Sequence, residues 1–385
     1  MARKTRRQGT VTSRDVAARA GVSPMTVSRT LRTPELVTVG TRERVESAAR
    51  ELAYVPDLAA GALSSQRSGH VAVLLPSLRH TGFLRTVDGL SDTLRGHGYH
   101  ILIGDSYYSP DEQVELLRLV IGRRPEAIVL VASMDSDEAR DLLRQSRIPV
   151  VETWGQPAEP LDMVVGFSQH EAGRAMTESL VEQGYTRIGY LAGPAHTDPY
   201  GEQRRLGHLE ALAERGLDTS IHVVVSDTPM EIADGVSGVS TLRERYPEAD
   251  ALVCATDMTA LGALSECQRR GWRVPEDIAI AGCGNFDFAA SLNPSLTSVN
   301  LPSYTIGVRT AELIIARIGG EEQGDAVARP LDLGFEVVHR DSTRRKPSAA
   351  TATAHTASPA AASTTDGLEA PNIHERARSG GERHG

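Results

Sequence analysis

The chain has 385 residues, 40% of them hydrophobic, which is enough for two or three folding units with packed cores. No run of about 18 apolar residues occurs, and no apolar segment follows the basic N-terminus. We therefore expect no membrane span and no secretion signal, and predict a cytoplasmic protein. The three cysteines, Cys254, Cys267 and Cys283, lack the C-x-x-C spacing of metal and redox sites, so we expect core or pocket-wall thiols and no bound metal.

The charge is distributed unevenly along the chain. Residues 1–67 carry 12 Lys and Arg against 6 Asp and Glu, a net charge of +6, although the whole chain has a net charge of −9. The remaining residues therefore carry a net charge of −15. A basic head on an acidic body confines the attraction for phosphate to one end, because Lys and Arg displace counterions from nucleic acid. This distribution indicates a nucleic-acid-binding head.

Residues 11–32, VTSRDVAARAGVSPMTVSRTLR, predict two short amphipathic helices joined by a turn at Gly21. Thr12 and Asp15 form a capping-box sequence at the start of the first helix, and Ser23 caps the second. This pattern is a helix-turn-helix, in which the second helix reads the major groove of DNA with its N-terminal turns. A plain helical hairpin is the alternative interpretation, and the basic charge argues against it.

A third helix is predicted after Thr38, and it closes a small helical core. Inward-facing positions are expected at Val27 and Leu31 of the second helix and at Val45, Ala48, Ala49 and Leu52 of the third. Arg14 and Arg29 are expected mainly to hold phosphates, while Pro24, Met25 and Thr26 shape the choice of bases. The residues expected to contact DNA are Thr12, Ser13, Arg14, Ser23, Pro24, Met25, Thr26, Ser28, Arg29, Arg32, Thr38, Thr41 and Leu63.

From Gly69 onward, short aliphatic runs alternate with amphipathic helices, which predicts parallel sheets built from βαβ units. The rhythm restarts after Gly166. We therefore expect two doubly wound subdomains, with the segments near 296–301 and near 331 crossing between them. The predicted strands are 71–75, 101–104, 127–131, 149–152, 163–166, 187–191, 221–225, 251–254 and 278–282.

The runs DVAARAGVSPMTVSRTL and VTVGTRERVESAARELAYVPD closely resemble the LacI/GalR family of bacterial transcription repressors, and the resemblance extends to about Arg340. Within that family, MTVSRTLRTPELV, HVAVLLPSL and ECQRRGWRVPEDIAIAG resemble the gluconate-operon repressors. The resemblance implies a helix-turn-helix head, a two-lobed core similar to the periplasmic binding proteins, and a homodimer on pseudo-palindromic double-stranded operator DNA. It also implies a small-molecule effector between the lobes and no cofactor.

The expected domains follow from these patterns. The C-terminal tail is rich in Ala, Thr, Ser, Pro and Gly and shows no heptad repeat, so we expect a disordered segment and a dimer rather than a tetramer. The segments are a flexible basic arm (1–9), the helix-turn-helix domain (10–55), a hinge (56–68), the two-lobed core (69–340) and the tail (341–385). Lobe 1 is expected at about 69–167 and 298–330, and lobe 2 at about 168–297 and 331–340.

Residues 54–63, YVPDLAAGAL, occupy the place of the family's hinge helix, which implies that Leu63 inserts into the minor groove of the operator. Such an apolar wedge partly unstacks one base step and bends the duplex. Asp57 stands where relatives usually have Asn, and Gly61 where they usually have Arg or Gln. Both departures are expected to weaken hinge folding or phosphate contact. A plain linker is the alternative interpretation of this segment.

Ligands of open α/β sheets bind just beyond the carboxyl ends of the strands, and two facing lobes can close on a small molecule. Arg204 matches the arginine that relatives project into this cleft, with Arg205 as the alternative if the register is off by one. Relatives that bind sugars place an aspartate where this chain has Gly284, which favours a sugar acid such as gluconate over a neutral pyranose. The residues expected to bind the effector are Ser77, Phe83, Tyr108, Glu152, Trp154, Arg204, Thr256, Gly284, Asn285 and Ser303.

Two questions stay open at this stage. Tyr108, Glu152 and Trp154 fit equally well as cleft-lining or dimer-contact residues without a role in binding.

The expected function is a DNA-binding repressor of carbohydrate or sugar-acid catabolic genes, controlled by a small metabolite. The alternatives are a solute-binding protein of similar core fold, a related regulator that responds to a neutral sugar, and an enzyme. An enzyme is disfavoured because the sequence has no nucleophile elbow, Walker loop or HExxH motif.

Overall fold

The structure is a computed structural model that describes residues 11–55, 68–131, 136–195, 198–224, 231–320 and 330–345, with Arg32 described by its backbone alone. The predicted arm, most of the hinge with Leu63, and most of the predicted tail lie outside the described residues. Among the residues that are described, no helix is long and apolar enough to cross a membrane. No group of His, Cys, Asp or Glu side chains within those ranges could hold a metal ion.

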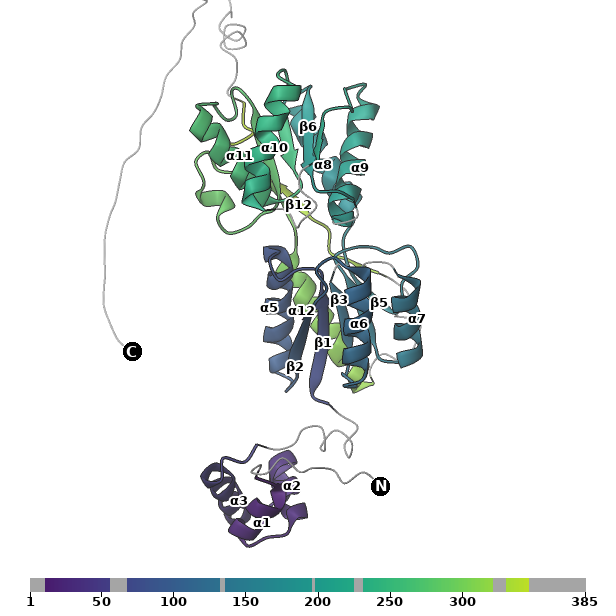
Figure 1. Cartoon of the computed structure of the whole chain (residues 1–385), viewed down its shortest axis with the longest axis vertical. Helices are drawn as coiled ribbons and strands as arrows, with labels where there is room; N and C mark the ends of the chain where they lie inside the picture. The colour runs from purple at the N-terminus through teal and green to yellow at the C-terminus, as the bar shows by residue number, and fades with distance from the viewer. Residues whose placement is uncertain are drawn as a thin grey trace, which may run out of the picture. The chain divides into compact units, whose positions relative to one another are not determined.

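The N-terminal part forms a three-helix core (Figure 1). Its elements are α1 (Ser13–Ala20), α2 (Pro24–Arg32), the short 3-10 helix η1 (Pro34–Leu36) and α3 (Val39–Glu51). The predicted caps are present, since the Asp15 carboxylate accepts the backbone N–H of Thr12 at 2.8 Å and the Ser23 hydroxyl accepts the N–H of Thr26 at 3.1 Å. The fully buried side chains of this core are Val16, Val27 and Val45.

One inward position differs from the expectation. Leu31 is 37% exposed, whereas Thr30 is 3% exposed and takes the inward place. Burial of Thr30 is tolerated because its hydroxyl donates a hydrogen bond to the Thr26 carbonyl at 2.8 Å. The prediction that Leu31 faces the core is therefore wrong. An exposed leucine at the end of α2 instead adds apolar surface to the helix that carries the predicted DNA-reading residues.

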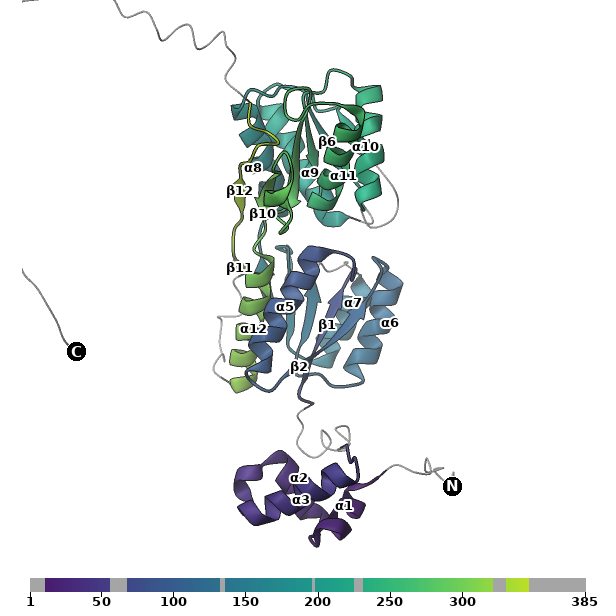
Figure 2. The same cartoon turned by 90° about the vertical axis from the view of Figure 1, so that its left-hand side faces the viewer.

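The first lobe is a parallel sheet of order β11-β5-β4-β3-β1-β2. Figure 2 shows α5 and α12 on one face of this sheet and α6 and α7 on the other. Two separate apolar clusters fill the two faces. The strands are β1 (His70–Leu75), β2 (His100–Asp105), β3 (Ile128–Val131), β4 (Val150–Thr153), β5 (Met163–Gly166) and β11 (Leu331–Asp332), and the helices are α5 (Thr81–Arg95), α6 (Pro110–Ile121), α7 (Asp137–Ser146) and α12 (Ser303–Gly319).

The second lobe has a sheet of order β12-β10-β9-β8-β6-β7, parallel except for the pair of β10 with β12. Helices α8 and α9 cover one face, and α10 and α11 cover the other (Figure 1). The strands are β6 (Ile188–Ala192), β7 (His222–Val224), β8 (Ala251–Cys254), β9 (Ala279–Gly284), β10 (Thr297–Asn300) and β12 (Glu336–Val338). The helices are α8 (Gln169–Glu182), α9 (Pro199–Glu214), α10 (Ile232–Arg245), α11 (Asp257–Arg270) and the 3-10 helix η2 (Ala289–Ser291).

All nine expected strands are present. The assignment of the C-terminal segments to the two lobes, however, differs from the expectation. Residues 298–330 were expected in lobe 1, yet β10 belongs to the second sheet, where Val299 pairs with Cys283. Residues 331–340 were expected in lobe 2, yet β11 belongs to the first sheet, where Leu331 pairs with Val165. The reason is that strand pairing depends on the neighbouring strands that the fold supplies, and the sequence of a strand of two to four residues does not specify its sheet.

Candidate functional site

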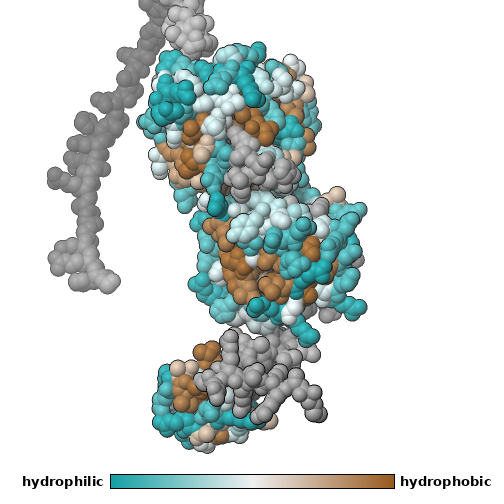
Figure 3. Space-filling view, in the orientation of Figure 1, coloured by the Kyte–Doolittle hydropathy of each residue, from teal (hydrophilic) through white to brown (hydrophobic). Residues whose placement is uncertain are grey.

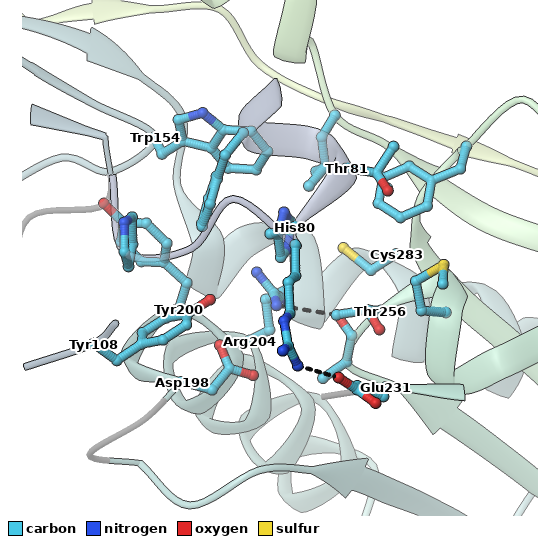
Figure 4. Close-up of a pocket in the computed structure, with 18 of the residues that line it drawn as sticks. His80, Thr81, Tyr108, Trp154, Asp198, Tyr200, Arg204, Glu231, Thr256 and Cys283 are labelled. Atoms are coloured by element: carbon cyan, nitrogen blue, oxygen red, sulfur yellow. Dashed lines mark hydrogen bonds and ion pairs between the residues drawn. The ribbon is translucent and has the colours of Figure 1, made fainter. Parts of the chain in front are cut away.

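A cavity of about 320 Å³ lies between the two lobes. Its lining comes from turns that follow the strands of both sheets, as expected for an open α/β fold. The first lobe contributes residues after β1, β2 and β4, and the second contributes the start of α9 and residues after β8 and β9. Figure 4 shows Arg204 near the middle of this pocket, with Tyr108 and Asp198 on one side and Thr256 and Cys283 on the other.

Arg204 is the buried cation of the pocket. Its side chain comes from α9 and the residue is only 6% exposed. The Nη2 group donates to the Ala255 carbonyl at 3.0 Å, and Nη1 donates to Oε1 of Gln169. No carboxylate within the described residues forms an ion pair with it, and its Nε is buried without a hydrogen-bond partner there. Arg205, the register alternative, instead pairs with Glu202 at 2.6 Å and lies outside the lining.

Aromatic rings form one wall of the pocket. His80 stacks on Phe83 with ring centroids 4.0 Å apart, and the Trp154 ring meets Phe83 edge-on at 5.0 Å. Phe286 of the second lobe meets His80 edge-on at 6.3 Å. Burial, and secondarily the positive charge of Arg204, lower the pKa of His80 to about 4. The imidazole is therefore neutral at pH 7 and belongs to an apolar, ring-rich wall.

Two acidic residues complete the polar lining. Asp198 caps α9, because its Oδ1 accepts the N–H of Gly201 at 2.7 Å. Burial raises the pKa of the Tyr108 hydroxyl, and the nearby negative charge of Asp198 raises it further. Glu231 pairs with Arg79 of the first lobe at 2.8 Å, and both residues line the pocket. The pocket thus combines one lobe-bridging ion pair with a separate cation at Arg204 and anion at Asp198.

Several of the residues expected to bind the effector line this pocket. They come from α5, from α9, from the end of β9 and from the segments that follow β2, β4 and β8, which the fold brings together. These residues are Phe83, Tyr108, Trp154, Arg204, Thr256 and Gly284.

Ser77 and Glu152 were expected at the site but lie outside the lining. Ser77 is buried, and its hydroxyl accepts the N–H of Arg79 at 3.1 Å within the turn after β1. Glu152 is also buried, and its Oε2 accepts the N–H of Leu161 at 2.7 Å. Arg140 lies 3.9 Å from the same carboxylate. Both side chains are occupied in holding loops of the first lobe.

Asn285 and Ser303 also lie outside the lining. Asn285 follows β9, and its amide is held between Asn300 at 3.2 Å and Arg340 at 2.7 Å. Ser303 begins α12, where its hydroxyl donates to the Leu301 carbonyl at 3.5 Å. The turn at 284–286 therefore points Gly284 and Phe286 toward the pocket and Asn285 away from it.

Sequence reasoning missed His80, Asp198, Tyr200 and Glu231 as pocket residues. A local signal existed for Asp198, because an aspartate directly before a proline is a typical start of a helix. No comparable signal existed for Glu231, whose pairing with Arg79 joins two parts of the chain far apart in sequence.

The residues of the head that are predicted to contact DNA differ in their exposure to solvent. Met25 is 71% exposed, and Pro24, Arg29 and Arg14 are also exposed. Ser23 is exposed but accepts the capping hydrogen bond of α2. Thr12, Ser13, Thr26, Ser28 and Thr41 are half-buried, and Thr38 is exposed. The side chain of Arg32 and the whole of Leu63 lie outside the described residues.

Comparisons with known proteins agree with this architecture. The profile described as "Bacterial regulatory proteins, lacI family" matches residues 12–57, and that of a "Periplasmic binding protein-like domain" matches residues 177–343. The HTH-type transcriptional regulator GntR of Escherichia coli (strain K12) is 34% identical over 321 residues, which cover 83% of this chain and 95% of that relative. GntR of Pseudomonas aeruginosa is 36% identical over 341 residues, 89% of this chain and 98% of that relative.

A solved LacI-family regulator from Silicibacter pomeroyi superposes with a TM-score of 0.81 at 32% identity, covering 87% of this chain and all of that one. A DNA-binding head, a two-lobed core and a pocket between the lobes define an effector-controlled transcription regulator. The chain belongs to the lacI family of bacterial regulatory proteins and is a DNA-binding transcriptional regulator.

Proposed function

We propose that this regulator represses genes of sugar-acid or carbohydrate catabolism, and that a hexonate such as gluconate binds its pocket and weakens its hold on the operator. The observation that carries the proposal is Arg204, a buried cation that no carboxylate of the described residues neutralises by an ion pair. A buried charge is costly unless a partner compensates it. The carboxylate of a sugar acid supplies such a partner through charge-assisted hydrogen bonds to the planar guanidinium.

The rest of the pocket supports a ligand with hydroxyl groups. Asp198 and Thr256 lie on opposite sides of Arg204 (Figure 4), and both carry oxygens that accept hydrogen bonds from hydroxyls. The stacked rings of His80 and Phe83 offer an apolar face for the carbon chain. Gly284, which stands where sugar-binding relatives are expected to have an aspartate, leaves Asp198 as an acidic hydroxyl acceptor in this lining.

A neutral sugar is the second candidate effector, and the charge balance of the lining favours it. Arg79 and Glu231 neutralise each other, and the negative charge of Asp198 offsets the positive charge of Arg204 over a longer distance. A ligand without charge would keep this balance. The two candidates differ in one respect, because only the sugar acid depends on the guanidinium as a counter-charge.

Calorimetry on the full chain tests the effector with gluconate, glucose and ribose. We expect gluconate to bind most tightly, and Arg204→Met to lower its affinity by about two orders of magnitude, as loss of a buried charge-assisted pair implies. Arg205→Met is the matched control, because Arg205 is adjacent in sequence but pairs with Glu202 outside the pocket. Tighter binding of glucose or ribose, or unchanged gluconate binding by Arg204→Met, would overturn the sugar-acid assignment.

We further propose that the chain acts as a homodimer on a pseudo-palindromic operator, in the cytoplasm and on the nucleoid, and that its pocket binds without catalysing a reaction. Figure 3 shows an apolar area on the lobe that carries α5 and β2. Strand β2 is the edge of its sheet, and Leu102 and Ile103 on it are 39% and 45% exposed. An exposed apolar edge strand is a typical pairing surface, and a second copy of the chain would cover it.

Under this proposal the residues that contact DNA are those of α2 and its neighbours, with Leu63 of the hinge in the minor groove. Two recognition helices related by a two-fold axis would read two inverted half-sites. A gel shift with DNA from the region upstream of the gene tests the operator. Footprinting of the shifted complex then maps the contacts. Protection of two inverted half-sites about one helical turn apart would support the operator proposal, and protection of one half-site would contradict it.

A further inference from the structure

The first helix of the second lobe begins with a buried glutamine that contacts both lobes. Gln169 follows the link from β5 directly, and it is 1% exposed. Its Oε1 accepts a hydrogen bond from Nη1 of Arg204, and its Nε2 donates to the Trp154 carbonyl at 2.9 Å. Arg204 belongs to the second lobe, and Trp154 follows β4 in the first. Gln169 therefore joins the pocket cation to the opposite lobe.

The orientation of this amide is dictated by its partners. A guanidinium can only donate hydrogen bonds, and a backbone carbonyl can only accept them. Gln169 must therefore point its oxygen at Arg204 and its NH2 group at Trp154. Neither Glu nor Met can make both contacts, because Glu at neutral pH has no donor and Met has neither group.

Trp154 holds an unusual conformation at this point. Its φ is +74°, in the left-handed region that a bulky aromatic residue rarely adopts, and it is 2% exposed. The indole N–H donates to the Thr86 hydroxyl at 2.9 Å, and that hydroxyl donates to the Ser303 carbonyl at 2.8 Å. Thr86 lies on α5, and Ser303 begins α12. Trp154 is thus tied to the helix pair that covers one face of the first lobe.

The helices around this series of hydrogen bonds are packed too closely for their backbones to shift easily. A Cβ on Gly173 of α8 would lie 2.0 Å from the Arg204 carbonyl of α9, so these two helices are already in direct contact. A Cβ on Gly307 of α12 would lie 2.1 Å from the Thr86 carbonyl of α5. Because both helix pairs are closely packed, the side chains between them are the groups that have room to respond to a change at the Arg204 guanidinium. Gln169, through Trp154, provides one such side-chain route between the two pairs.

We propose that Gln169 is the positioning residue of the effector arginine and that it couples occupancy of Arg204 to the first lobe through Trp154. An effector carboxylate competes with Gln169 for the guanidinium, and the Gln169 to Trp154 hydrogen bond passes that change to α5 and α12. This inference rests on the proposed function, because it takes a bound carboxylate as the event that is transmitted. Coupling free energies between two sites of this kind correspond to about 5- to 150-fold changes in affinity.

The first experiment measures operator affinity without and with saturating gluconate and takes the ratio as the coupling. We expect Gln169→Met to reduce this ratio to about twofold or less. We expect Gln169→Glu to lower gluconate affinity by about tenfold or more, because the new carboxylate occupies the guanidinium. Thr177→Val is the matched control. Thr177 is buried in the same helix, its hydroxyl donates to the Gly173 carbonyl at 2.9 Å and lies 2.8 Å from Nδ1 of His208, and neither Thr177 nor His208 lines the pocket. Its ratio should equal that of the unmodified protein.

A structural role alone would lower the melting temperature and leave the ratio unchanged. An unaltered ratio in Gln169→Met, or unaltered gluconate affinity in Gln169→Glu, would overturn the proposal. Should Gln169→Met fail to fold, Gln169→Glu carries the same test, because it keeps the size of the side chain and the acceptor that faces Arg204.

The second experiment needs no ligand. The sequence contains two tryptophans, and Trp272 packs between Arg243 and Arg270 in the second lobe, so Trp272→Phe leaves Trp154 as the single reporter. In that background we compare the emission of Arg204→Met, Gln169→Met and the double variant. If Arg204 acts on Trp154 through Gln169, the double variant has the emission of Gln169→Met alone. Additive shifts would refute the role of Gln169 whatever the effector is. Non-additive shifts in a protein that ignores gluconate would refute only the choice of effector.

Discussion

Nη1 of Arg79 lies 2.8 Å from Oε1 of Glu231, and this ion pair joins the turn after β1 in the first lobe to the start of α10 in the second. Both side chains line the effector pocket. The pair is well exposed, at 75% and 54% of the two side chains, and exposed pairs contribute little to stability. Its importance therefore lies in bridging the lobes at the pocket.

The first prediction concerns passage of the ligand. Arg79→Gln should change the free energy of unfolding by less than about 1 kcal/mol. The association and dissociation rates of gluconate should both rise by a few fold, because a ligand no longer has to wait for the ion pair to open. Stopped-flow fluorescence measures both rates. Arg118→Gln is the control, since Arg118 forms a comparably exposed pair with Glu138 away from the pocket. Rates equal to those of the control would contradict a gating role.

The second prediction concerns the choice of operator. Met25 is 71% exposed near the N-terminus of α2, where a recognition helix meets the base edges. Met25→Ala should change the ranking of operator variants, with about 1 to 3 kcal/mol at each affected base pair. Selection from a randomised half-site library measures that ranking. Leu119→Ala, at a 57% exposed leucine on α6, should preserve it. A Met25→Ala protein that selects the same sequences would show that another face reads the bases.

The third prediction concerns acid stability. The pKa of His80 is lowered to about 4, first by burial and then by Arg204, from a usual value of 6.5. Between these pH values the unfolded chain binds the proton and the folded chain does not, so stability falls as the pH is lowered from 6.5 to 4. His80→Phe keeps an aromatic ring and cannot titrate. Its stability should fall less over this range, by as much as about 3 kcal/mol.

Urea unfolding at a series of pH values measures this difference. Leu119→Phe is the control, because Leu119 is 57% exposed on α6 and the change adds a ring without a titrating group, so its curve should run parallel to that of the unmodified protein. Parallel curves for His80→Phe as well would mean that His80 carries its proton in the folded state.

The fourth prediction concerns assembly. A second copy of the chain is proposed to cover the β2 edge, where Ile103 is 45% exposed. Ile103→Asp should raise the dimer dissociation constant by about tenfold or more, because it places an unpaired charge in an apolar interface. Sedimentation velocity over a dilution series measures the constant. Leu119→Asp introduces the same charge on the outer face of α6 and should leave it unchanged. Equal dissociation constants for both variants would move the interface elsewhere.

The local patterns of the sequence determined the elements of the fold. Aliphatic runs predicted the strands from β1 to β9, and Ser23 before Pro24 predicted the start of α2. The resemblance of the head and core to one family could likewise be recognised from the sequence, and the comparisons confirmed it. Caps, helical periodicity and strand runs act over a few neighbouring residues, so these features are readable without the tertiary structure.

The tertiary structure decided which side chains reach the pocket. Glu152 and Asn285 both stand near strand ends, as several pocket residues do, yet Glu152 is held by Leu161 and Arg140, and Asn285 by Asn300 and Arg340. These partners come from distant segments. The same holds for the sheets that β10 and β11 join.

Gln169 is the clearest example of a residue whose contacts only the tertiary structure reveals. In the sequence it is a polar residue at the start of a predicted helix, and nothing nearby assigns it a function. In the structure it is 1% exposed between Arg204 and Trp154. The direction and partner of a buried polar side chain depend on which distant donors and acceptors the packed lobes bring within about 3 Å. Local sequence determines where a helix begins, and only the packing of one lobe against the other determines what its first residue touches.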